Sequence, residues 1–140
     1  MQVFRHFPEY KQAPCALAIG NFDGMHLGHQ ALLRSMIDSA QSQNLQSAVL
    51  TFEPHPREFF AAHTAPARLS SMREKLEHFA EAGVAQCYVC RFNQAFAKIS
   101  AAQFMQGILR DSLNAKSILV GDDFRFGAQR AGSVADFIAA

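Results

Sequence analysis

Short apolar runs that end at glycines or prolines alternate along this chain with segments of helical periodicity. The candidate strands are Cys15 to Gly20, Ser47 to Phe52, Val84 to Arg91 and Ser117 to Val120, and we expect Gln2 to Phe7 to add one more. Strands that alternate with helices need crossover connections, which produce a parallel sheet. We therefore predict an α/β fold with helices on both faces, and ligands beyond the carboxyl ends of the strands.

The first two candidate helices carry clear sequence signals. Residues 27–43 place five apolar side chains on one helical face, and these are Leu32, Leu33, Met36, Ile37 and Ala40. Ser71 and Glu74 form a capping box, which opens the second helix. Gly83 is placed to end that helix, because glycine adopts the left-handed conformation of a helix C-terminus.

Two further helices are expected nearer the C-terminal end. Ser100 and Gln103 form a second capping box, and the helix that they open extends to about Leu113, where Asn114 can serve as the C-terminal cap. Ser133 then N-caps another helix, and the sequence ends within it. We therefore expect the chain to stop before the last elements of its domain.

The composition argues against several classes of protein. A chain of 140 residues has the size of a single domain. Its 13 Lys and Arg against 12 Asp and Glu give a net charge of +1, so we expect no nucleic-acid partner. No apolar stretch approaches the ~20 residues that a membrane-spanning helix needs, and the N-terminus lacks the apolar core of a signal peptide. We therefore expect no membrane partner.

The three cysteines do not form a disulfide framework by number, and they indicate a reducing cytoplasm. Cys87 and Cys90 have the spacing of a redox motif. They lie within a candidate strand, however, where positions three apart point to opposite faces. A low-pKa dithiol needs a helix N-terminus, and none follows. We interpret both residues as structural strand cysteines.

The loop from Gly20 to His29 is the strongest candidate for chemistry. Its glycines let the backbone approach a ligand, and the helix after it offers free N–H groups and the positive end of its dipole to a phosphate. His26 and His29 can both point at an anion there and stabilise charge during transfer. The residues leave two alternatives open. The histidines and Asp23 can bind a metal, or the loop is a plain turn with solvated histidines.

This loop and two further segments resemble one known family. The loop reads GNFDGMHLGH over residues 20–29, the second segment reads TFEPHPR over residues 51–57, and the third reads VGDDFRFG over residues 120–127. Together they are similar to the bacterial FAD synthetases, which are bifunctional riboflavin kinase/FMN adenylyltransferases. His-x-Gly-His alone is shared by many nucleotidyltransferases, whereas the three loops together are specific. The resemblance covers essentially the whole chain and implies the Rossmann-like fold of the nucleotidyltransferase superfamily.

The resemblance implies that FMN and ATP react to give FAD and pyrophosphate, without a covalent enzyme intermediate. His26 and His29 would be catalytic and stabilise the α-phosphate. The nucleotide-binding residues would be Gly20, Asn21, Phe22, Asp23, Gly28 and His55. Magnesium would neutralise the departing pyrophosphate, although the sequence names no ligand for it. For His55, a rigid turn between prolines is an equal alternative.

The third segment is similar to the family's flavin-facing loop. The resemblance implies that Phe124 and Phe126 wall the isoalloxazine ring and that Asp123 accepts a hydrogen bond from its polar edge. Core packing is the alternative for the two phenylalanines, because phenylalanine is more often buried. Arg125 and Arg130 can meet phosphates, but solvated side chains are the simpler interpretation.

The family's later triphosphate-gripping motif and its riboflavin kinase module do not occur in residues 1–140. We therefore expect an FMN adenylyltransferase module that is incomplete at its C-terminus, with reduced or no turnover. Two other functions stay open. One is a different His-x-Gly-His nucleotidyltransferase that acts on nicotinamide mononucleotide, phosphopantetheine or glycerol phosphate. The other is a non-catalytic module that binds a nucleotide or a flavin.

Overall fold

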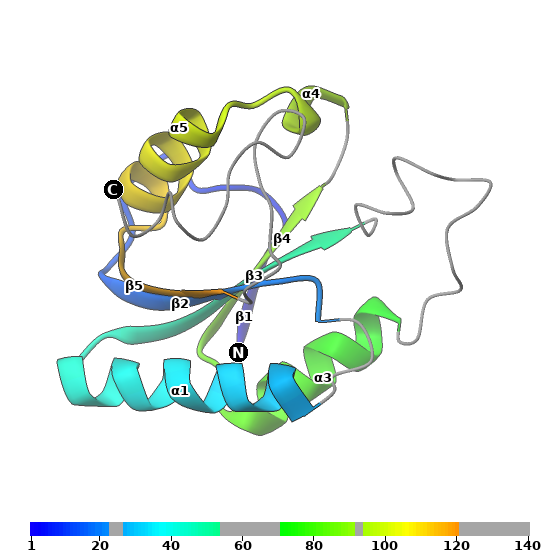
Figure 1. Cartoon of the computed structure of the whole chain (residues 1–140), viewed down its shortest axis with the longest axis vertical. Coiled ribbons are helices and arrows are strands. Elements are labelled where there is room, and N and C mark those ends of the chain that lie inside the picture. The colour runs from blue at the N-terminus through cyan, green and yellow to red at the C-terminus, as the bar shows by residue number, and fades with distance from the viewer. Residues whose placement is uncertain (23–26, 54–70, 92–93, 121–140) are drawn as a thin grey trace.

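Five parallel strands form a single sheet in the order β1-β4-β3-β2-β5 (Figure 1). The computed structural model describes residues 1–22, 27–53, 71–91 and 94–120. The strands are β1 (Gln2–Phe4), β2 (Cys15–Ile19), β3 (Gln46–Glu53), β4 (Gln86–Arg91) and β5 (Ala115–Val120). Every pairing between them is parallel. The predicted parallel α/β sheet is therefore confirmed.

Helices cover both faces of this sheet. Figure 1 shows α1 (Leu27–Gln43) and α3 (Met72–Ala82) on one face. The other face carries α4 (Gln94–Ala97), α5 (Ala101–Gln103) and the π-helix η2 (Phe104–Ser112). Among the described residues no helix combines the length and the apolar character needed to cross a membrane. The helix predicted to begin at Ser133 lies outside the described residues.

The predicted helix signals act as expected. Leu33, Met36 and Ala40 of α1 are buried, which confirms its apolar face. Ser71 accepts a hydrogen bond from the backbone N–H of Glu74 at 3.2 Å, and the Glu74 carboxylate accepts one from the Ser71 backbone at 3.3 Å. Gly83 ends α3 with φ of 97°. A side chain is strained at that angle, so the chain stops its helix where the sequence provides a glycine.

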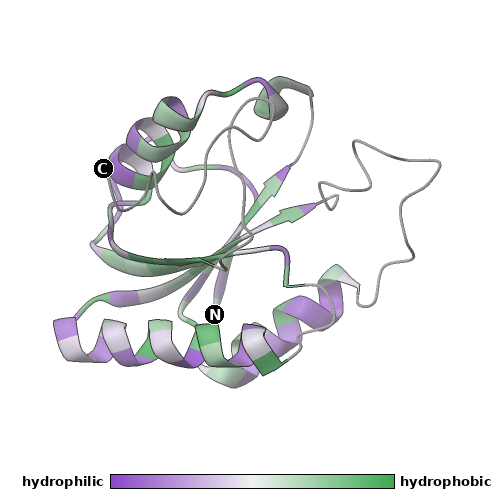
Figure 2. Cartoon of the chain, viewed as in Figure 1, coloured by the Kyte–Doolittle hydropathy of each residue, from purple (hydrophilic) through white to green (hydrophobic). Residues whose placement is uncertain are grey.

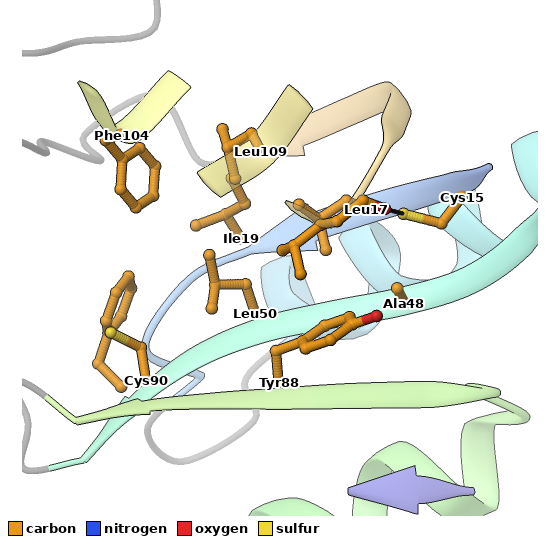
Figure 3. Close-up of a cluster of buried hydrophobic side chains, with 11 residues drawn as sticks. Cys15, Leu17, Ile19, Ala48, Leu50, Tyr88, Cys90, Phe104 and Leu109 are labelled. Carbon is orange, nitrogen blue, oxygen red and sulfur yellow. Dashed lines mark hydrogen bonds between the residues drawn. The ribbon is translucent and has the colours of Figure 1, made fainter. Parts of the chain in front are cut away.

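The sheet separates two apolar clusters, and the two neighbouring cysteines of β4 fall into different ones. Cys87 belongs to the α1–α3 cluster, which is built on Phe22, Leu33, Met36 and Phe79 with the adjoining strand residues. Cys90 lies on the opposite face in the η2 cluster with Phe104 and Leu109 (Figure 3). All three cysteines are free. Figure 2 shows apolar residues in the strands at the centre of the sheet, and both apolar and polar residues along the helices on its two faces.

Burial decides the chemistry of these thiols. Burial raises the pKa of Cys87 to about 12, and the pKa of Cys90 rises to about 12 for the same reason. A thiol with such a pKa stays protonated at neutral pH and is a poor nucleophile. The interpretation of Cys87 and Cys90 as structural strand cysteines is confirmed.

The helix after Ser100 differs from the expected α-helix. The capping box of Ser100 and Gln103 is present, but after three α-helical residues the chain widens into π-helical turns. The N–H of Leu113 donates to the carbonyl of Ile108, five residues earlier, at 2.9 Å. The buried side chains of this segment, Phe104, Leu109 and Leu113, are spaced by five and four residues. Wider turns place all three against the sheet.

Candidate functional site

β2 is the strand at which the order of strand addition along the sheet reverses. β2 pairs with β3 on one side and with β5 on the other. The chain moves from β2 through α1 to β3 and on to β4, and it returns to the opposite side of β2 for β5. In open α/β sheets, a crevice forms beyond the carboxyl ends of the two strands at such a switch point, and ligands bind there. The residues that follow β2 are therefore the candidate site.

The backbone of these residues is tied to the end of the neighbouring strand. The N–H of Gly20 donates to the carbonyl of Leu50 at 3.1 Å. The hydroxyl of Thr51, a fully buried residue of β3, donates to the carbonyl of Asn21 at 3.3 Å. A loop held by both bonds presents its remaining groups in a fixed direction, which lowers the entropy that a ligand must remove.

Gly20 allows the loop to fold back on itself. A Cβ at this position would lie 3.3 Å from the Phe22 ring, which is tighter than ordinary van der Waals contact. Phe22 itself has φ of 55°, in the left-handed region that side chains rarely adopt. The absence of a side chain at Gly20 leaves room for the Phe22 ring, and the left-handed backbone of Phe22 allows the ring to lie against Gly20.

Phe22 was expected to line the nucleotide site. Its exposed fraction is 0%, and its role in nucleotide binding stays a prediction. Phe22 packs edge-on against Phe79 of α3, with ring centroids 5.1 Å apart at 82°. The bulk of an aromatic side chain favoured the core over the surface.

His29 lies in the first turn of α1 and is held from below by this ring. Its imidazole centroid is 5.3 Å from that of Phe22, at an interplanar angle of 56°. The residue is half-buried, and Leu27 and Gly28 beside it are exposed. The exposed start of α1 presents backbone N–H groups and the positive end of the helix dipole. His29 and these groups therefore share one side of the switch point.

Asn21 adds a polar atom to the same place. Its side-chain oxygen Oδ1 is buried and has no hydrogen-bond partner in the part of the chain that the structure describes. A buried acceptor without a partner costs about 1–3 kcal/mol. A ligand that donates a hydrogen bond to Oδ1 recovers this cost, so the atom suits a ligand that carries an amino or hydroxyl group.

The structure thus brings together one part of the predicted site. Gly20, Asn21, Gly28 and His29 lie around the end of β2 and the start of α1. The remaining predicted residues lie outside the described residues, so their roles stay predictions. They are Asp23, His26, His55, Asp123, Phe124 and Phe126.

The sequence analysis missed two residues that support the site, Thr51 and Phe79. Thr51 interrupts the apolar run of β3, and this single polar residue was a signal that it anchors something. Phe79 carried no signal beyond its place on an apolar helix face.

The described residues offer no metal centre of their own. Within residues 1–22, 27–53, 71–91 and 94–120, no three His, Cys, Asp or Glu side chains are grouped so that they could hold a metal ion. The metal-binding alternative for the loop involves Asp23 and His26, which lie outside the described residues, so it stays open. Magnesium is accordingly given no ligand among these residues.

The fold and the switch-point loop define a Rossmann-like α/β protein with a candidate phosphate site at the start of α1. The sequence matches the FAD synthetase family over residues 9–140. The chain belongs to this family.

Similar proteins occur in several bacteria. The chain is 46% identical over 135 residues to the bifunctional riboflavin kinase/FMN adenylyltransferase of Escherichia coli K12, which covers 94% of this chain and 43% of the relative. It is 44% identical over 131 residues to the protein of the same name from Pseudomonas fluorescens, covering 94% and 41%. The chain therefore spans about two fifths of the length of these relatives.

A solved structure supports the fold independently. A crystal structure described as a macrolide-efflux protein from Streptococcus pneumoniae superposes with a TM-score of 0.79 at 24% identity, covering 99% of this chain and 47% of the other. At this identity the likeness shows the fold alone, and it carries no argument about function.

Proposed function

We propose that this chain is an FMN adenylyltransferase module, which transfers AMP from ATP to FMN and forms FAD and pyrophosphate in FAD biosynthesis. The observation that carries the proposal is the position of His29 in the first turn of α1, the helix that follows the switch-point strand β2, beside the exposed start of that helix. Membership of the FAD synthetase family supports the same reaction.

In the proposed reaction, a phosphate oxygen of FMN attacks the α-phosphorus of ATP. The bond between that phosphorus and the oxygen bridging to the β-phosphate breaks, and pyrophosphate leaves with the electron pair. Negative charge accumulates on the non-bridging oxygens of the α-phosphate in the transition state. An imidazole N–H of His29 and the N–H groups at the start of α1 would stabilise that charge. His26 would assist in the same role.

Positioning is the second contribution of this site. The Phe22 ring fixes the direction of the His29 imidazole, and Thr51 fixes the loop backbone at Asn21. A catalytic group that is already in place needs no further ordering in the transition state. Asn21 Oδ1 would accept a hydrogen bond from the adenylate side of ATP, and Gly20, Asp23, Gly28 and His55 would complete the nucleotide pocket. Asp123, Phe124 and Phe126 would face the flavin.

Magnesium belongs to this proposal only as the ion that accompanies ATP. Since the described residues supply no cluster of ligands for it, no step of the reaction is assigned to it here. The proposed partners are the substrates FMN and ATP and, in a longer protein, a riboflavin kinase module like the one named in the relatives. The three free, buried cysteines suit the cytoplasm, which we propose as its location.

The test supplies the full-length protein with FMN, ATP and magnesium and follows pyrophosphate and FAD. We expect both products from the wild type and a loss of at least tenfold in rate for His29→Ala. Equal rates in both proteins would refute the role of His29, and no product at all would refute the adenylyltransferase.

Two parallel measurements separate the alternatives. Replacing FMN by nicotinamide mononucleotide, phosphopantetheine or glycerol phosphate tests for another nucleotidyltransferase, which would release pyrophosphate only with one of these acceptors. Calorimetric titration with FMN and with ATP tests for a non-catalytic module, which would bind a ligand without forming product.

A further inference from the structure

The ring of Phe79 joins α3 to the loop that follows β2. Phe79 belongs to α3 and is fully buried. Its ring packs edge-on against that of Phe22, with the centroids 5.1 Å apart and the planes at 82°. Aromatic pairs favour this edge-to-face arrangement, which gives the two rings a preferred relative orientation. A side chain of α3 therefore contacts the segment that carries the candidate site.

Phe22 contacts both Phe79 and the candidate catalytic histidine. Its ring centroid lies 5.3 Å from that of the His29 imidazole, at an interplanar angle of 56°. Phe22 is itself fully buried, and a Cβ on Gly20 would lie 3.3 Å from its ring. A ring enclosed in this way keeps its position only while its neighbours keep theirs, because protein cores are close-packed. Phe79 can therefore influence the imidazole through Phe22.

The apolar pattern of α3 explains an apolar residue at position 79, but it does not require an aromatic one. Met72 and Leu76 pack against the same cluster as Phe79, and a leucine or methionine at position 79 would continue this helical stripe. An edge-on partner for the Phe22 ring, however, requires a second ring. We therefore look for a function of the ring beyond the filling of the core.

Loss of the Phe79 ring would act on Phe22 first. Replacing a buried phenylalanine by a smaller side chain leaves a gap, and the neighbouring side chains relax into it only in part. A shift of the Phe22 ring would change the surface on which the His29 imidazole rests. In catalysis, misplacing a group by about 1 Å can lower a rate on the order of a hundredfold. A small change in the core can therefore be measured in the reaction.

We propose that Phe79 is a positioning residue of the adenylyl transfer, which sets the orientation of the His29 imidazole through the ring of Phe22. Phe79 acts from within the core and touches no substrate. This inference rests on the proposed function, because it takes His29 to stabilise the α-phosphate during the reaction.

The kinetic test uses the full-length protein with FMN, ATP and magnesium. Phe79→Leu removes the ring and keeps the core apolar. We expect kcat for FAD formation to fall roughly tenfold, because the imidazole is held less firmly when charge develops on the α-phosphate. The KM values for ATP and FMN should stay within about twofold, since the lost interaction matters in the transition state rather than in the bound ground state. An unchanged kcat in a folded Phe79→Leu protein would overturn the proposal.

A double variant shows whether Phe79 acts through Phe22. If it does, Phe22→Leu and the double variant Phe22→Leu/Phe79→Leu should have the same kcat within about twofold, because the ring that transmits the effect is already gone. A further tenfold fall in the double variant would mean that the two residues affect the rate independently, and the proposal would be wrong.

Val84→Ala is the matched control. Val84 is buried in the same α1–α3 cluster, but it lies just before β4 begins, at the amino end of that strand. The candidate site lies beyond the carboxyl ends. We expect Val84→Ala to lower the thermal midpoint, as Phe79→Leu does, and to leave kcat within about twofold of the wild type. An equal fall in kcat in both variants would show that the rate follows stability, and it would overturn the proposal.

The nuclear magnetic resonance signals of the His29 imidazole test the same coupling without turnover. They are identified in protein carrying isotope-labelled histidine by their absence in His29→Ala, and they respond to the adjoining Phe22 ring. We expect these signals to shift in Phe79→Leu and to keep their wild-type positions in Val84→Ala. Signals that do not move in Phe79→Leu would contradict the proposed role of Phe79.

Two other outcomes are kept apart by these measurements. If circular dichroism shows that Phe79→Leu is unfolded, Phe79→Met takes its place, because methionine adapts to the shape of a core without supplying a ring. If the wild type forms no FAD, the proposed function fails, and the His29 signals still decide whether Phe79 sets the orientation of the imidazole.

Discussion

The ring of Phe22 supports the imidazole of His29 from below, with their centroids 5.3 Å apart. Phe22 in turn rests edge-on against Phe79. The candidate catalytic histidine is thus the last member of a row of three aromatic rings that begins on α3. Because packed rings have few alternative positions, contact with this row limits the orientations of the His29 imidazole at the edge of the sheet.

Replacing the Phe22 ring in this row should reduce the rate of FAD formation more than the affinity for the substrates. Phe22→Leu leaves the core apolar but removes the surface on which the imidazole rests. We expect a loss of about 1–2 kcal/mol in the free energy of unfolding. The kcat of FAD formation should fall on the order of tenfold, because His29 is no longer held in one orientation. Urea denaturation and steady-state kinetics measure the two effects.

Phe104→Leu provides the control for this change. Phe104 is equally buried but lies in the η2 cluster on the opposite face of the sheet. It should lose a similar free energy of unfolding while kcat stays near the wild-type value. If both variants lost kcat to the same extent, the rate would follow global stability and the Phe22–His29 contact would have no special role.

The hydroxyl of Thr51 should matter for ATP binding. Thr51→Val has nearly the same shape but removes the donor to the Asn21 carbonyl. We expect the free energy of unfolding to fall by about 1 kcal/mol and ATP affinity to fall a few-fold, since the loop gains freedom that binding must remove. Thr51→Ser keeps the donor and should bind ATP like the wild type. Equal affinities of the Val and Ser variants would contradict the proposed anchor.

The fold was predictable because its signals are local. The period-3.6 pattern of residues 27–43, the capping box at Ser71 and the glycine at position 83 each act within one or two turns of chain. Alternation of such elements with short apolar runs then restricts the sheet to parallel pairings. The wide turns of η2 were not predictable, because they arise from three side chains that all need the same sheet surface.

The site was predictable only where backbone groups form it. A glycine-rich turn before a helix indicates an anion site through its N–H groups, and it led to Gly20, Gly28 and His29. The role of Phe22 depends on whether an aromatic ring turns inward or outward, which sequence spacing alone does not determine. Thr51 acts across the fold on a loop far away in sequence. Its contribution became visible only when β3 was placed beside that loop.

Gly20 should not tolerate even the smallest side chain. In Gly20→Ala the new Cβ would lie 3.3 Å from the buried Phe22 ring, which is enclosed by core residues and has little room to move. We expect a loss of about 1–3 kcal/mol in the free energy of unfolding from this overpacking, together with weaker ATP binding. At Gly107 a Cβ would meet nothing within 4 Å. Gly107→Ala should therefore change stability by less than about 1 kcal/mol. Equal effects at the two positions would show that the Phe22 ring can give way.

Alkaline pH should destabilise the protein through its buried thiols. Burial raises the pKa of Cys87 from 9.0 to about 12. A group with a raised folded-state pKa stabilises the fold fully below its unfolded pKa and loses that contribution as pH rises toward the folded value. The loss therefore falls between pH 9 and pH 12, and it amounts to about 1 kcal/mol for one such thiol by pH 10. Urea denaturation at pH 7.5 and pH 10 should show the decrease, and Cys87→Ala should show a decrease smaller by that amount, because alanine has no proton to lose. If the two proteins lost equal stability over this range, the Cys87 thiol would titrate at its ordinary pKa, and its burial in the α1–α3 cluster would be wrong.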